Sequence, residues 1–232
     1  MISETTFARG YSSFWMEYFP WLNSYSQTVN AYQLNRFSAP YSEFDKTEHR
    51  SINNTIAFFH FRNLTSDLNF PLEKSKDEAL QYMMRFPRNN VLTYEFNSND
   101  KYIIKGLLKN LQKIPKINLV LDPFFSGCGI IDNCRGDVLQ GNKLIEVKSG
   151  NRYIQPADIK QLIVYLALNW ISSNKYNIHQ IEIYNPRVGF SWTTDTDDLF
   201  RSVTSFSKEE ALEQLTKYLV MQSEEMVIEQ NI

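Results

Sequence analysis

The segment GDVLQGNKLIEVKSGNRYIQPADIKQLIVY, residues 136–165, holds two short apolar runs that each carry charge. Asp137 follows a glycine in the first run, and Glu146 and Lys148 bracket a single valine in the second. Residues 140–142, Gln-Gly-Asn, form a credible hairpin turn between the runs. Side chains two apart on a strand face the same side. We therefore expect Glu146 and Lys148 to project together, and the hairpin to bring Asp137 across toward them.

Three charges at one sheet edge are costly to bury unless they serve a purpose. Binding of Mg²⁺ would be such a purpose, because this ion takes oxygen ligands and is usually held by one or two carboxylates with water and substrate phosphate. Asp137, Glu146 and the backbone carbonyl of Val147 would provide that ligand set for Mg²⁺ or Mn²⁺. Such a metal lowers the pKa of a bound water and neutralises charge on a phosphate. Lys148 would orient or deprotonate the water and stabilise the transition state.

The same residues resemble the signature of a known nuclease superfamily. Gly136-Asp137 followed by Glu146-Val147-Lys148 is similar to the PD-(D/E)XK motif, with the glutamate nine positions after the aspartate. On the next predicted helix, Gln161 and Tyr165 resemble the QxxxY element of the RecB- and Cas4-like branch. The resemblance covers about residues 136–170. It implies a restriction-endonuclease-like core and a metal-dependent nuclease with these catalytic residues: Asp137, Glu146, Lys148, Gln161 and Tyr165.

The resemblance also implies roles for the helix residues and for a further acid. Gln161 would hydrogen-bond the substrate phosphate or a metal-bound water, and Tyr165 would position it. The plainer interpretation is that these two residues, four apart, form the polar edge of a core helix. Members of this branch often carry an acidic residue or a histidine on an earlier helix near the metal. Glu78 and Glu95 are the candidates here, although each is also typical of an ordinary surface glutamate.

Composition excludes several other classes of protein. The chain has 232 residues, of which 43% are hydrophobic and 22% charged, as in ordinary soluble domains. Its apolar runs fall short of the roughly 18 residues of a membrane helix, and residues 1–14 lack the pattern of a signal peptide. Cys128 and Cys134 are too few for a disulfide framework or a four-cysteine iron–sulfur cluster. We expect a cytoplasmic protein with reduced thiols and no membrane contact.

Charge is distributed unevenly along the chain. Residues 101–160 hold ten Lys or Arg against five Asp or Glu, whereas residues 195–232 hold nine acids against three bases. A basic middle beside an acidic tail favours a local site for a polyanion. Arg135, Arg152 and Lys160 flank the proposed site and are candidates for gripping phosphates. The alternative is that these cations solvate a helix face.

Periodicity predicts an α/β domain with a mixed sheet flanked by helices. Helices are expected over 4–35, 73–85 and 100–113, from 156 and from 207; strands over 117–125, 129–140, 142–149, 179–186 and 188–194; and a loop over 36–55. Residues 1–70 are predicted to be a helical, aromatic-rich extension that packs on or docks to a nuclease-like core at 71–232, which ends in an acidic helix. Such an aromatic segment is also typical of a subunit contact.

The sequence thus predicts a Mg²⁺- or Mn²⁺-dependent nuclease that hydrolyses DNA phosphodiester bonds. The resemblance implies DNA repair, restriction or defence against phage. The chain carries no GxxxxGK[ST] helicase motif, so a helicase, ATPase or other subunit is the predicted partner, reached through the aromatic N-terminus. The alternatives are a non-cleaving nucleic-acid-binding or assembly subunit with the same fold, and an RNA nuclease.

Overall fold

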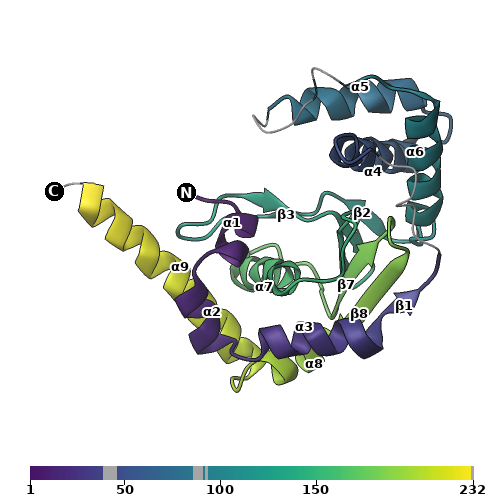
Figure 1. The fold of residues 1–232 in the computed structure, drawn as a ribbon. Helices are drawn as coiled ribbons and strands as arrows, with labels where there is room; N and C mark the ends of the chain where they lie inside the picture. Colours follow the sequence, from purple (N-terminus) through teal and green to yellow (C-terminus); the bar gives the residue numbers. More distant parts are fainter. Residues whose placement is uncertain (39–45, 86–90, 92–93, 231–232) are drawn as a thin grey trace.

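A mixed β-sheet lies at the centre of the computed structural model, which describes residues 1–38, 46–85, 91 and 94–230 (Figure 1). Within this part of the chain the sheet has six strands, in the order β1 (Asn35–Arg36), β8 (Phe190–Asp195), β7 (Gln180–Asn185), β6 (Lys143–Val147), β5 (Val138–Gln140) and β2 (Leu119–Leu121). β6 and β7 are parallel, and the other neighbours are antiparallel. The predicted α/β class with a mixed sheet flanked by helices is confirmed.

Helices surround this sheet, and a short ribbon of β3 (Phe124–Phe125) and β4 (Cys134–Arg135) extends from its edge. Within the described residues the helices are α1 (Glu4–Arg9), α2 (Ser12–Tyr18), α3 (Leu22–Thr28), the π-helical turn η1 (Val29–Gln33), α4 (Arg50–Ser66), α5 (Leu72–Met83), α6 (Ser98–Leu111), α7 (Pro156–Ile171), α8 (Thr196–Val203) and α9 (Lys208–Gln230). None of the helices in this part of the chain is long and apolar enough to cross a membrane.

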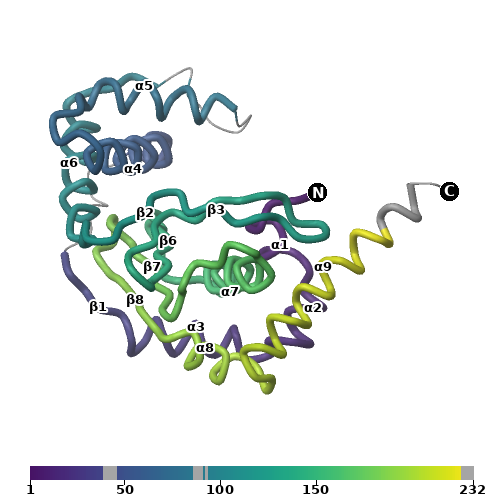
Figure 2. Tube along the Cα trace, turned by 180° about the vertical axis from the view of Figure 1, so that it is seen from behind, coloured from purple at the N-terminus to yellow at the C-terminus, as the bar shows by residue number. Residues whose placement is uncertain are grey.

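Each face of the sheet is covered by its own layer of helices (Figure 2). α7 packs on one face together with α1–α3, α8 and α9, and alternate strand residues such as Leu144 and Ile183 point into this layer. α4, α5 and α6 cover the other face, which receives Val138, Ile145 and Tyr184. The period-2 alternation of strands divides the residues of β6 between the two layers.

The β5–β6 hairpin has the turn that the sequence predicts. Val138 lies opposite Ile145, and Gln140 lies opposite Lys143. Gly141 adopts a φ of 62° between the two strands, a conformation that glycine reaches without steric cost. One further step of this register places Asp137 across from Glu146, as expected.

Two of the predicted strands are each broken in the middle. Residues 117–125 form β2 and β3, with Asp122 at a φ of 51° ahead of Pro123 between them. Residues 129–140 form β4 and β5, which are separated at Gly136 and Asp137. The two breaks lie side by side, because the Asp122 amide donates to the Asp137 carbonyl at 3.1 Å. The chain therefore bends at Asp122 and at Asp137, and Asp137 is the first residue of the proposed metal site.

The prediction of a loop over 36–55 is wrong at both of its ends. Arg36 belongs to β1, and α4 begins at Arg50; residues 39–45 of that segment lie outside the described part. The start of α4 was not predicted because its first turns carry polar residues, Ser51, Asn54 and Thr55, on the face that does not pack on the core. These residues interrupt the helical pattern of apolar residues in the sequence. α8 was not predicted either.

The aromatic N-terminal segment is part of the main core. Phe7, Phe14, Trp15 and Phe19 are all buried in the α7 layer, and the Trp15 indole donates to the Phe7 carbonyl at 3.2 Å. These four rings are therefore buried against other residues of the same chain and do not form an exposed surface. The position of a domain boundary near residue 70 stays a prediction, and α4 and α5 on its two sides share one apolar cluster.

Truncation of an N-terminal ring should therefore destabilise the whole protein. We expect Phe7→Ala to lower the free energy of unfolding by about 3–5 kcal/mol, the usual cost of removing a buried aromatic ring. Tyr32→Ala, at a ring that is 85% exposed, is the control and should change it by less than about 0.5 kcal/mol. Urea denaturation followed by circular dichroism measures both, and equal stabilities for the two variants would contradict the packing described here.

Candidate functional site

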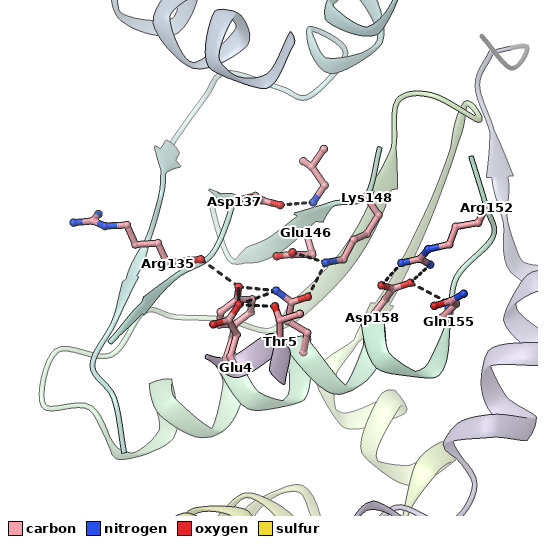
Figure 3. Close-up of polar contacts among 12 residues, drawn as sticks. Glu4, Thr5, Arg135, Asp137, Glu146, Lys148, Arg152, Gln155 and Asp158 are labelled. Atoms are coloured by element: carbon pink, nitrogen blue, oxygen red, sulfur yellow. Dashed lines mark hydrogen bonds and ion pairs between the residues drawn. The ribbon is translucent and has the colours of Figure 1, made fainter. Parts of the chain in front are cut away.

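Three of the predicted charges meet at the edge where β5 and β6 begin and end (Figure 3). Asp137 immediately precedes β5, Glu146 lies near the end of β6, and Lys148 follows that strand. The Lys148 amide donates to the Tyr184 carbonyl at 2.9 Å, which continues the pairing with β7 and fixes the backbone beyond the strand. The structure thus brings together the residues that the sequence singled out.

Lys148 connects the sheet edge to helix α7. Its ammonium donates to Glu146 Oε1 at 2.9 Å and to Gln161 Oε1 at 2.6 Å. Glu146 and Lys148 lie on the same side of the strand, as their spacing predicts, and Val147 packs toward the α4–α6 layer. One cation therefore holds a strand carboxylate and a helix amide in fixed positions.

Asp137 is positioned by the backbone of β6. Its Oδ2 accepts a hydrogen bond of 2.7 Å from the Val147 amide. Burial, and secondarily the charge of Glu146, raise the pKa of the Asp137 carboxyl well above its usual value. A partly buried carboxylate with another carboxylate beside it is an unfavourable arrangement in the absence of a cation.

Glu146 and Lys148 respond to this environment in different ways. Burial raises the pKa of Glu146, although the Lys148 charge opposes that change. Burial alone would lower the pKa of Lys148, but the carboxylates of Glu146 and Asp137 together raise it above its usual value. Lys148 is therefore an ammonium at neutral pH.

Gln161 and Tyr165 lie one turn apart on α7 and contact each other. The Gln161 amide donates to Tyr165 Oη at 3.0 Å, and the Tyr165 hydroxyl donates to the Arg135 carbonyl at 3.2 Å. Burial raises the pKa of Tyr165 far above its ordinary value, so the ring stays a neutral donor. Pro156 in the first turn, and a capping box between Gln155 and Asp158, fix the start of this helix.

A carboxylate that the sequence did not indicate completes this network. Glu4 of α1 accepts from Gln161 Nε2 at 3.2 Å and lies 3.4 Å from Tyr165 Oη. Its charge also raises the pKa of Glu146. Of the two candidates named from sequence, Glu78 on α5 lines the same cleft as Asp137 and accepts from Asn63 at 2.7 Å, whereas Glu95 is exposed ahead of α6.

The three predicted phosphate-binding cations do not form one group. Arg152 is held by Asp158 in a two-pronged ion pair of 2.6 and 2.8 Å. Lys160 is half-buried with its ammonium 5.1 Å from the centre of the Trp15 ring, and burial lowers its pKa. Arg135 alone of the three lines the cleft described next, and its guanidinium points away from Glu146 (Figure 3).

A cleft of about 680 Å³ opens between helices α4 and α5 and the edge of the sheet. Asp137, Val147 and Ser149 form its sheet side. Glu146, Lys148, Gln161 and Tyr165 lie beyond this edge, on the α7 side. Asp137 and Val147 are therefore the residues of the proposed metal site that line the cleft.

Two observations bear on a metal. Among the described residues, no group of three or more His, Cys, Asp and Glu side chains is arranged to hold an ion. Glu146 Oε2, however, is buried and has no hydrogen-bond partner within the described part of the chain. A buried carboxylate oxygen left unpaired beside a second desolvated carboxylate fits a hard divalent cation, which takes oxygen ligands. Two carboxylates and the Val147 carbonyl, completed by water, remain the candidate donor set.

Comparisons with known proteins place no further constraint on this site. No protein-family model, no curated protein and no solved structure matches the chain. The resemblance to the nuclease superfamily therefore rests on the residues described above.

Removal of the Asp137 charge should stabilise the metal-free protein. Because the folded-state pKa of Asp137 is raised, the folded chain binds a proton there more tightly than the unfolded chain does. The free energy of unfolding then falls as the pH rises from about 4 through the raised pKa, and stays reduced above it. Asp137→Asn lacks this loss, so in EDTA at neutral pH it should melt above wild type, by about 2–4 °C for each kcal/mol recovered.

Thermal unfolding in EDTA at pH 4 and at pH 7.5 measures this difference. The exposed carboxylate variant Asp132→Asn is the control and should melt with the wild type at both values. A gap between Asp137→Asn and wild type that is no larger at pH 7.5 than at pH 4 would contradict the proposed electrostatics.

Proposed function

We propose that this chain is a metal-dependent nuclease that hydrolyses phosphodiester bonds in DNA. The observation that carries the proposal is the buried Glu146 Oε2, which has no partner among the described residues and lies beside Asp137, with Lys148 held against the same carboxylate. Desolvated carboxylates next to a fixed cation are typical of active sites. The resemblance of these residues to the PD-(D/E)XK motif supports the same activity, on a restriction-endonuclease-like fold.

In this proposal Asp137, Glu146 and the Val147 carbonyl hold Mg²⁺ or Mn²⁺. When bound, the metal supplies an activated water and neutralises charge on the phosphate. Hydrolysis forms a P–O bond to the water oxygen and breaks the P–O bond to one sugar oxygen, which leaves with the proton that the water loses. Negative charge is carried by the phosphoryl oxygens in the transition state.

Lys148 acts as a hydrogen-bond donor in this scheme. Its raised pKa keeps it protonated at neutral pH, which favours stabilisation of the phosphate oxygens over removal of a proton from water. Gln161 accepts from Lys148 and donates to Tyr165 and Glu4. It therefore sets the direction of the ammonium, and Tyr165 buttresses Gln161.

The second candidate is a subunit that binds nucleic acid without cutting it. The observation that favours it is the absence, within the described residues, of a group of three or more potential metal-ligating side chains. An RNA nuclease would use the same residues, because phosphate contacts carry no information about the sugar. A role in repair, restriction or defence, and a helicase or ATPase partner, remain parts of the proposal that rest on the resemblance.

Cleavage assays on wild type and Lys148→Ala test the activity. Labelled single- and double-stranded DNA and RNA are incubated with Mg²⁺, Mn²⁺ or EDTA. We expect cleavage of DNA that requires the metal and falls by about 10²–10³ in the variant, the usual cost of removing one hydrogen-bond donor to a developing negative charge. Lys217→Ala is the matched control, because Lys217 also pairs with a glutamate, Glu213, at 2.7 Å, but on the surface of α9.

Each other outcome decides against part of the proposal. Cleavage of RNA but not of DNA would show that the substrate is RNA. Cleavage that persists in EDTA, or is equal in wild type and Lys148→Ala, would remove the proposed site. Binding of DNA by a wild-type protein that cuts none of the substrates would favour the non-cleaving subunit.

A further inference from the structure

The cleft above Asp137 is walled by one face of each of two helices. Its residues on α4 include Thr55, Phe59 and Arg62, those on α5 include Glu78 and Tyr82, and Arg85 follows the end of α5. Spacings of three and four place each set on a single helix face. Among the described lining residues, neither helix contributes an aliphatic side chain. Polar, aromatic and guanidinium groups without aliphatic ones are unlike a surface made for apolar docking.

Arg62 is fixed over the entrance to the site by two contacts. Its Nη1 donates to Asp122 Oδ2 at 2.8 Å, and its guanidinium carbon lies 4.3 Å from the centre of the Phe59 ring. The side chain is still 32% exposed. Stacking and pairing together hold the planar guanidinium in place, which preorganises it for an anion.

A second arginine, Arg135, also contacts Asp122, the residue that pairs with Arg62. Arg135 Nη1 donates to the Asp122 carbonyl at 3.0 Å. Asp122 is in turn bonded through its amide to the Asp137 carbonyl. Two guanidinium groups, from α4 and from β4, are therefore anchored beside the residue that leads into the proposed metal site.

Aromatic rings lie next to these cations. Phe59 and Tyr82 face each other across the helix pair, with ring centres 5.4 Å apart and planes tilted by 46°. Tyr82 is 43% exposed. Rings beside a positively charged track are the elements with which proteins hold unpaired bases, because every base has a face that stacks.

We infer that this cleft holds single-stranded nucleic acid, with its phosphates on Arg62 and Arg135 and a base against Tyr82. The inference deepens the proposed function, on which it rests for the identity of the reacting phosphate. A double helix hides its base faces, so it would gain nothing from the rings. The cleft volume of about 680 Å³ lies within the range of small-ligand pockets.

The acidic residues of the cleft are matched by cations. Among the described lining residues, Arg62, Arg85 and Arg135 balance the charges of Glu78, Asp122 and Asp137, and Asp122 is paired directly with Arg62. A phosphate that enters would share the Arg62 guanidinium with Asp122.

Binding measured in EDTA separates this inference from the question of cleavage. Fluorescence anisotropy follows labelled single-stranded DNA and RNA 12-mers, the matching DNA duplex and a mononucleotide over a range of salt concentrations. For the wild type we expect single strands to bind more tightly than the duplex or the mononucleotide. Tyr82→Ala should weaken single-strand binding by about tenfold, the scale of one lost base stack. Arg62→Ala should lower the slope of log affinity against log salt by about 0.7, the value for one phosphate contact on a single strand.

Matched surface variants control for general effects. Tyr32→Ala removes a more exposed tyrosine from η1, and Arg201→Ala removes an arginine that also pairs with an aspartate, Asp198, on α8. Both should bind like the wild type, and thermal melting of all variants checks that they fold. Single-strand binding that depends on Tyr82 and Arg62 supports the inference even if no metal-dependent cleavage is found, which would refute the proposed activity alone.

Three results would overturn the inference. If the duplex or the mononucleotide binds at least as tightly as single strands, the cleft does not select single strands. If Tyr82→Ala and Tyr32→Ala lose equal affinity for single strands, the cleft is not the binding site. A chain that cuts DNA with metal, yet whose binding is unaffected by Tyr82→Ala and Arg62→Ala, would retain the proposed function and refute the role of the cleft.

Discussion

The rest of the site depends on two desolvated carboxylates that lie together at one bend of the sheet. Asp137 and Glu146 each have a raised pKa because of burial, and the Lys148 charge, which is hydrogen-bonded to Glu146, opposes the rise in both. One oxygen of Glu146 is left without a partner within the described residues. Such a pair costs stability in the metal-free chain. In the proposed function, a divalent cation held by these two carboxylates would offset that cost.

The fold serves this edge from both faces of the sheet. On one face, α7 brings Gln161 to Lys148 and Tyr165 to Gln161, and α1 brings Glu4 to both of these helix residues. On the other face, α4 and α5 stand over Asp137 and wall the cleft that leads to it (Figure 1). The first layer orients the polar groups, and the second determines what can approach them. Chemistry and access are thus assigned to different helices, which allows the two to be tested by different variants.

Local spacing accounts for what could be predicted from sequence. The hairpin, the shared side of Glu146 and Lys148, and the pairing of Gln161 with Tyr165 follow from periods of two and 3.6 residues. Contacts made across the chain could not be predicted in this way. Glu4 lies 157 positions before Gln161. Arg62 contacts Asp122 from α4, a helix whose start was not predicted because of its polar face. Arg152 lies near the site in sequence, but both Nη atoms of its guanidinium are bonded to Asp158 in the first turn of α7, unlike the single bond from Arg62 to Asp122.

Calorimetric titration of Mn²⁺ into the metal-free protein tests the central claim most directly. The wild type should bind the metal with a saturable heat, and Asp137→Asn should bind it far more weakly. Glu95→Gln, at a carboxylate exposed away from the cleft, should match the wild type. Saturable binding that requires Asp137 would establish why two carboxylates are desolvated at this edge. A wild type that takes up no metal, or an Asp137→Asn protein that binds it equally well, would contradict the account.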